Sequence, residues 1–156
     1  MKKYIILVVA LISIFSVSAF NSSKQAQVTE YSFYGENEYF AISDGSITLS
    51  DTESVFDGGK LEVIKSDLFT DIDSYSATFY TVMENGERKE FSSAGATGVT
   101  ADNIRICRGY GKVSSNGVNF KNNIKSIENG FFFELKTVNT VGNENIYTLQ
   151  LNVVEN

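Results

Sequence analysis

Apolar and polar residues alternate along much of the chain after residue 29, a pattern typical of β-strands with one buried face. The clearest example lies near the C-terminal end, where apolar side chains occupy every second position of residues 131–136 and of residues 147–153. A turn around Gly142-Asn143 separates the two runs. The pattern therefore predicts a C-terminal antiparallel hairpin with one face in the core.

The pair Asp44-Gly45 lies between two further alternating runs and predicts a two-residue hairpin turn of type I′. With that turn, Ile42 pairs with Ile47, and Phe40 pairs with Leu49. All four apolar side chains then share one face, which is expected to be buried.

A third hairpin is predicted around Asn85-Gly86, with residues 75–84 leading into the turn and residues 87–91 returning from it. This register places Tyr80 opposite Phe91. The stretch that follows, residues 92–101, is rich in small and polar side chains (SSAGATGVTA) and is expected to be a surface loop.

One short helix is predicted near residues 120–128. Phe120, Ile124 and Ile127 fall at the i, i+4 and i+7 spacing of one helical face, and Gly130 stands where a helix should end.

Further strands are expected at residues 30–34, 60–65 and 103–108, which brings the total to about nine short strands. Closely spaced strands with little helix favour an all-β fold, specifically an antiparallel β-sandwich of immunoglobulin-like architecture. A β-barrel is the alternative. The chain contains no proline, so its turns must depend on glycine, asparagine and aspartate.

The N-terminal residues have the pattern of an export signal. Two lysines precede the uncharged apolar residues 5–15, and the small residues 17–19 follow. Residues 1–19 are therefore expected to be a cleaved signal peptide, with retention as an uncleaved membrane anchor as the alternative. Residues 20–29 are expected to form a flexible linker and residues 30–156 a single domain. The composition suggests a bacterial protein.

Charge and missing residue types exclude several function classes. The chain has 13 basic and 19 acidic residues, and loss of residues 1–19 leaves 11 against 19, a net charge of −8 that opposes binding to nucleic acid. The absence of histidine excludes Ser-His-Asp and Cys-His catalysis and histidine-containing metal sites. Cys107 is the only cysteine, so no intramolecular disulfide can form, and a structural role is expected for it.

The candidate binding residues lie in a basic segment. Residues 103–127 contain five basic side chains and no acid, whereas residues 28–74 contain eleven acids and two lysines. This asymmetry could orient a partner, or the two segments could neutralise each other in the fold. The speculative binding residues are Arg105, Arg108, Tyr110 and Lys112.

Tyrosines offer a second candidate surface, because exposed phenol rings bind sugars and proteins. Cross-strand packing is the competing interpretation of the same residues. The tyrosines concerned are Tyr31, Tyr34, Tyr39, Tyr75, Tyr80 and Tyr110.

These observations favour an exported, non-catalytic binding or interaction module at the cell surface or outside the cell, with a protein or a wall polysaccharide as partner. No catalytic residue, metal ligand or cofactor is assigned. One alternative is a secreted hydrolase that uses carboxylates on polysaccharide, and another is a structural component of a surface assembly.

Overall fold

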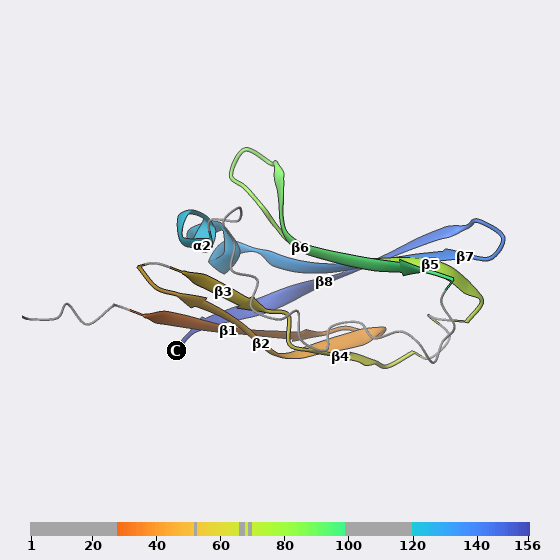
Figure 1. Ribbon diagram of the computed structural model, residues 1–156, viewed down its shortest axis with the longest axis horizontal. Helices are drawn as coiled ribbons and strands as arrows, with labels where there is room; N and C mark the ends of the chain where they lie inside the picture. The colour runs from red at the N-terminus through yellow and green to blue at the C-terminus, as the bar shows by residue number, and fades with distance from the viewer. Residues whose placement is uncertain (1–27, 52, 66–67, 69, 99–119) are drawn as a thin grey trace, which may run out of the picture.

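The computed structural model describes residues 28–51, 53–65, 68, 70–98 and 120–156 (Figure 1). This part of the chain contains eight strands and one helix. They are β1 (Thr29–Glu36), β2 (Phe40–Leu49), β3 (Ser54–Asp57), β4 (Lys60–Val63), β5 (Ile72–Val82), β6 (Arg88–Thr97), α2 (Phe120–Asn129), β7 (Phe131–Asn139) and β8 (Glu144–Glu155).

The strands form one continuous antiparallel sheet in the order β3-β2-β1-β8-β7-β5-β6, and β4 pairs with β2 beside β3. Strand β8 joins the two halves, because residues 144–151 pair with β7 and residues 152–155 pair with β1. In Figure 1, β5, β6 and β7 lie above β1 to β4, and β8 crosses between them, so the sheet curls like a half-barrel. The prediction of an all-β fold with one short helix is confirmed, whereas a two-sheet immunoglobulin-like sandwich is not.

Phenylalanine rings fill the inner face of the curled sheet. Phe33 of β1 lies 5.7 Å from Phe56 of β3 and 5.1 Å from Phe131 of β7, measured between ring centroids. Phe79 of β5 lies 5.1 Å from Phe56. All four side chains are about 99% or more buried. Ring contacts between strands from both halves therefore hold the sheet in its curled shape.

Helix α2 closes one end of this core, as the apolar spacing predicted. Phe120 and Ile127 are fully buried, and the Phe120 ring stacks on Phe91 at 4.9 Å. The helix ends at Asn129, and the amide of Gly130 donates to the carbonyl of Ser126.

The C-terminal hairpin is also confirmed. Phe131 pairs with Leu151 and Phe133 with Leu149, and all four side chains are buried.

The hairpin predicted at Asp44-Gly45 is wrong, because β2 runs straight through this pair and lies along β1. Between the Phe33–Gly45 and Gly35–Ile42 pairs, β1 contributes one residue and β2 contributes two, so Asp44 lies in a β-bulge, with φ of 57°. The extra residue in β2 shifts the alternation of buried and exposed side chains by one position after Asp44. Phe40, Ile42, Ile47 and Leu49 therefore share the buried face, as the hairpin would also have required.

The hairpin at Asn85-Gly86 is confirmed, with its register shifted by one residue. Tyr80 pairs with Glu90, because the loop holds three residues and the amide of Met83 donates to the carbonyl of Glu87. Beyond this pair, Phe91 lies at a bulge and turns toward the core. The prediction of a surface loop over residues 92–101 is wrong for residues 92–97, because β6 continues to Thr97. Small side chains suit this strand. A Cβ atom on Gly95 would lie 2.5 Å from the carbonyl oxygen of Tyr75.

The strands predicted at residues 30–34 and 60–65 are confirmed as β1 and β4. The signal peptide at residues 1–19, most of the linker, the strand at residues 103–108 and Cys107 lie outside the described residues. Within the described ranges, no helical segment is long and apolar enough to cross a membrane.

Candidate functional site

The basic residues singled out from the sequence, Arg105, Arg108 and Lys112, lie outside the described residues together with Tyr110. The role of this segment therefore stays a prediction. Of the remaining bases of residues 103–127, Lys121 lies 3.6 Å from Asp51, so it contacts the acidic half of the chain. This pair is exposed and fits the interpretation in which the two segments partly neutralise each other.

Most of the described tyrosines are used in packing, as the competing interpretation expected. Tyr31 belongs to the core, and Tyr75 packs against it. Tyr39 packs against Tyr147, with ring centroids 4.8 Å apart. Tyr34 differs from these, because it lies on the outer face of the sheet with 52% of its surface exposed.

Tyr80 lies on the same outer face but is enclosed by its neighbours. The Phe132 ring stacks on it at 5.3 Å, and the guanidinium carbon of Arg88 lies 3.8 Å from its centroid. Arg88 in turn donates two hydrogen bonds to Glu134, at 2.8 and 3.0 Å, and its Nε lies 3.1 Å from Glu90.

We call these five residues the closed ladder. The hydrogen bonds to Glu134 raise the pKa of the Arg88 guanidinium, and burial raises the pKa of the Tyr80 hydroxyl. Phe132 and Arg88 both contact the Tyr80 ring, and Arg88 is itself bound to Glu134. The side chains of the ladder therefore bind one another, which suits a role in stabilising the sheet better than a role in ligand binding.

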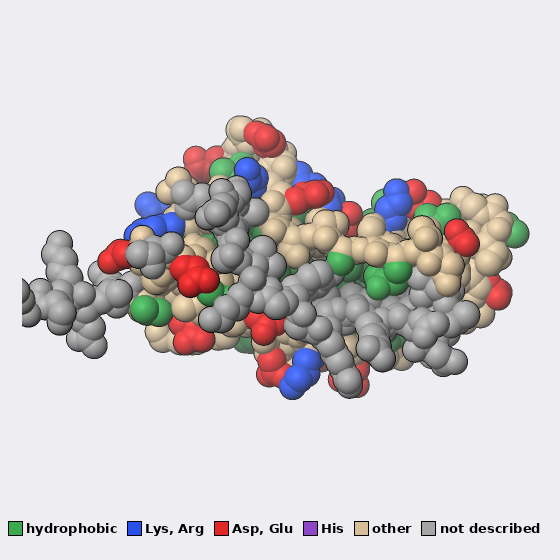
Figure 2. All heavy atoms as spheres, viewed as in Figure 1, with side chains coloured by type: hydrophobic (Ala, Val, Ile, Leu, Met, Phe, Trp, Pro, Cys, Tyr) green, Lys and Arg blue, Asp and Glu red, His purple; other side chains and the backbone are tan. Residues whose placement is uncertain are grey.

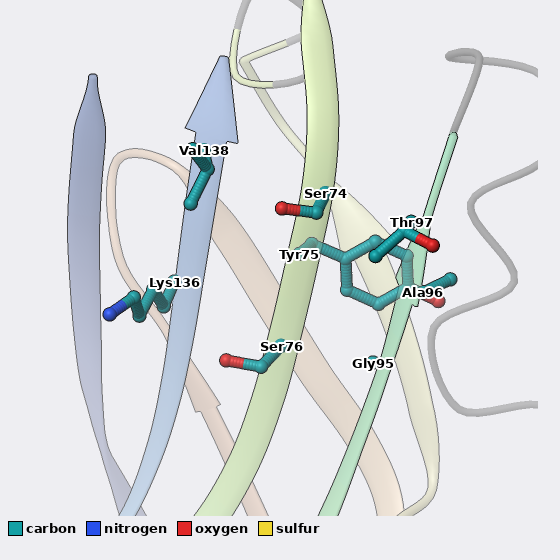
Figure 3. Close-up of a pocket in the computed structure, with 8 residues that line it drawn as sticks. All are labelled: Ser74, Tyr75, Ser76, Gly95, Ala96, Thr97, Lys136 and Val138. Atoms are coloured by element: carbon teal, nitrogen blue, oxygen red, sulfur yellow. The ribbon is translucent and has the colours of Figure 1, made fainter. Parts of the chain in front are cut away.

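A pocket of about 420 Å³ lies further along β5, β6 and β7 (Figure 3). Ser74, Ser76 and Thr97 line it with hydroxyl groups, and Gly95 supplies no side chain. Its one charged residue, Lys136, points toward β8 in Figure 3 and pairs with Glu144 at 2.5 Å. The pocket therefore offers hydroxyl groups and apolar atoms, with its charge already engaged.

A larger depression of about 740 Å³ lies over the β-bulge, where β1, β2 and β8 meet on the outer face. We call it the bulge groove. Tyr34 is paired with Asn152 of β8 and faces the bulge of β2 on its other side. The lining residues are Ser32, Phe33, Tyr34, Gly35, Glu36, Ala41, Ile42, Ser43, Asp44 and Asn152.

The turn before β4 fixes the shape of this groove. A Cβ atom on Gly59 would lie 2.2 Å from the carbonyl oxygen of Ser43 and 2.6 Å from the amide nitrogen of Gly45, so only glycine fits against the bulge. Gly59 also has φ of 74°, and its amide donates to Asp57 at 3.0 Å. The backbone on both sides of Asp44 is therefore packed against the turn.

Lys60 holds the Asp44 side chain at the rim. Its ammonium lies 2.6 Å from the Asp44 carboxylate, and this hydrogen bond raises the pKa of the lysine. The two side chains are 76% and 63% exposed, so the pair contributes little to the stability of the fold. Its main effect is to orient the Asp44 side chain at the rim of the groove.

Several polar groups of the bulge groove have no internal partner. The side chains of Tyr34, Glu36 and Asn152 make no hydrogen bond or ion pair with any other residue in the described part of the chain, and all three are exposed. A surface tyrosine ring with a carboxylate and an amide beside it presents an apolar face together with donors and acceptors. The groove can therefore bind a ligand without displacing an internal contact.

Sequence reasoning named Tyr34 only as one tyrosine among six and did not find Glu36, Asp44 or Asn152. The one local signal was Asp44-Gly45, because aspartate before glycine favours the left-handed conformation in a bulge as well as in a hairpin turn. The contribution of Asn152 depends on the pairing of the first and last strands, which no local pattern predicts.

No group of three or more possible metal-ligating side chains occurs among the residues that the structure describes. Comparison of the chain with models of known protein families, with curated proteins and with solved structures found no match.

Proposed function

We propose that the chain is an exported, non-catalytic binding module, at the cell surface or secreted, and that the bulge groove is its binding surface. The observation that supports this best is the difference between Tyr34, which is exposed beside unpartnered polar groups, and Tyr80, which is enclosed by Phe132 and Arg88. Binding surfaces need such available groups, whereas a structural ladder does not.

Export is supported by the N-terminal pattern of two lysines, an apolar run and small residues. The finer fold proposal, an immunoglobulin-like β-sandwich, is supported by the passage of β8 from one half of the sheet to the other and by ring contacts between the halves.

A carboxylate-dependent hydrolase acting on polysaccharide is the second candidate, because Glu36 and Asp44 line the same groove. The Asp44 carboxylate is already bound by the Lys60 ammonium at 2.6 Å, and both side chains are largely exposed, whereas the general acid of a glycosidase lies in a shielded site. We therefore place binding ahead of hydrolysis.

The test is the binding of purified protein to intact producer cells and to their isolated wall polysaccharide. A variant with both Tyr34→Ala and Asn152→Ala should lose most of the binding, while Tyr80→Ala should keep it. A triple variant, with Arg105, Arg108 and Lys112 changed to alanine, tests the basic segment separately. Loss of binding in the triple variant alone would contradict the proposed surface, and release of reducing sugar from the polysaccharide would favour the hydrolase.

A further inference from the structure

The chemistry of the bulge groove favours a particular ligand class. Tyr34 presents an aromatic ring that is half exposed, and it stands between Asn152 on one strand and the bulge on the next. Carbohydrate rings combine apolar C–H faces with hydroxyl groups at their edges. A phenol ring bordered by polar side chains complements both features, because the ring contacts the C–H face while its neighbours bind the hydroxyls.

The hydrogen-bonding groups of the groove match hydroxyls better than they match a cation. The Asn152 amide, the Tyr34 hydroxyl and the Ser43 hydroxyl can each donate and accept, as sugar hydroxyls do. The Glu36 carboxylate accepts strongly from a hydroxyl group. A lysine or arginine of a partner would only donate, so it would leave the donors of the groove without acceptors.

Charge around the groove disfavours anionic ligands as well. Residues 28–65 contain eight acids and two lysines, and both lysines are held in ion pairs with Asp44 and Glu38. Figure 2 shows acidic side chains on both the lower and the upper parts of the molecule, and few basic side chains on the lower part. Such a surface repels phosphate-bearing or sulfated polymers. Lys60 at the rim also opposes a cationic group next to Asp44.

We propose that the bulge groove binds a neutral saccharide chain, with the Tyr34 ring against a sugar face and with Glu36 and Asn152 bound to its hydroxyls. The inference rests on the proposed function of the groove as the binding surface. The groove is lined by residues of three neighbouring strands, so an extended chain that crosses these strands can contact all of them. Asp44, fixed by Gly59 and Lys60, forms its rim.

The experiment measures calorimetric binding of the purified protein to neutral hexasaccharides (cellohexaose, maltohexaose and chitohexaose), with tri-lysine peptide as the cationic probe. At least one hexasaccharide should bind, with little change in affinity when salt is raised to about 0.5 M. Tyr34→Ala should weaken this binding about tenfold or more, and Tyr34→Phe should weaken it by less than about threefold. Tyr80→Ala is the matched control on the same face and should leave the affinity unchanged.

Three results would overturn the saccharide inference. If no hexasaccharide binds at about 10 mM while binding to cells still depends on Tyr34, the groove binds another class of ligand and the proposed function stands. Binding of tri-lysine that disappears in salt would identify a cationic ligand. If hexasaccharides bind equally to wild type and to Tyr34→Ala, the saccharide site lies elsewhere, and the proposed surface fails as well. Thermal unfolding confirms that each variant is folded.

Discussion

Two aromatic surfaces on the outer face of one sheet differ in what their neighbours leave available. In the closed ladder, Tyr80 is enclosed by Phe132 and Arg88, and Arg88 is bound by two carboxylates. In the bulge groove, Tyr34 stands exposed beside Glu36 and Asn152, whose side chains have no partner among the described residues. An aromatic residue on a sheet is therefore a candidate binding residue only when neighbouring side chains do not already cover its ring.

The two surfaces also differ in how their ion pairs are placed. The Arg88 and Glu134 side chains are 35% and 18% exposed, whereas those of Lys60 and Asp44 are 76% and 63% exposed. Exposed pairs contribute little to stability, and removal of one partner of a shielded pair leaves a charge that water reaches poorly. We therefore expect the ladder to stabilise the sheet and the rim pair to orient a side chain.

The largest effect is expected at the turn that shapes the groove. Gly59→Ala should lower the free energy of unfolding by about 3 kcal/mol, because the new Cβ meets the backbone of Ser43 and Gly45 at a residue with positive φ. Urea unfolding measures the change. Gly86→Ala is the matched control, since Gly86 has φ of 81° and no atom within 4 Å of its Cβ position, and it should cost about 1 kcal/mol. Equal losses in the two variants would show that Gly59 is not packed against the bulge.

The next effect separates the two ion pairs. Arg88→Ala should lower the free energy of unfolding by about 2 kcal/mol, because Glu134 loses both hydrogen bonds and Tyr80 loses the guanidinium above its ring. Lys60→Ala should change it by about 0.5 kcal/mol or less. Chemical unfolding of both variants checks the order, and a larger loss for Lys60→Ala would reverse our interpretation of the two surfaces.

The smallest effect is a pH dependence beside the groove. Lys65 donates to Glu38 at 2.7 Å and thereby holds the pKa of this carboxyl below its ordinary value of 4.5. A lowered pKa stabilises the folded protein above the ordinary value, and the contribution is lost as the pH falls through the folded value. Glu38→Gln should therefore unfold at a lower temperature than wild type at pH 7, and the difference between the two unfolding temperatures should shrink below pH 4.5.

Glu53→Gln is the control for this measurement, because the Glu53 side chain has no ion pair with another described residue. A difference for Glu38→Gln that grows as the pH falls would contradict the assigned role of Lys65.

Local alternation predicted the faces of the strands well. The buried set Phe40, Ile42, Ile47 and Leu49 follows from the sequence, because either a hairpin or a bulge at Asp44 shifts the alternation by one residue. The sequence could not distinguish these two structures, since both place aspartate in the left-handed conformation. Pairing of β2 with β1, β3 and β4 decides in favour of the bulge.

The bulge groove was beyond sequence reasoning for a different reason. Asn152 lies beside Tyr34 because the last strand pairs with the first, a contact between distant parts of the chain. Likewise, the sequence showed Arg88, Tyr80 and Phe132 as separate residues, and their enclosure of one another depends on the register of β5 with β6 and β7.

We expect the bulge groove to bind the ligand and the closed ladder to stabilise the sheet. The most direct test measures both properties in Tyr34→Ala and in Tyr80→Ala, as affinity for isolated wall polysaccharide and as free energy of unfolding. Tyr34→Ala should lose about tenfold in affinity with stability unchanged within about 0.5 kcal/mol, because its ring is exposed. Tyr80→Ala should keep its affinity and lose about 1 to 2 kcal/mol of stability. Loss of affinity in Tyr80→Ala with none in Tyr34→Ala would show that the ligand binds at the closed ladder and not at the bulge groove.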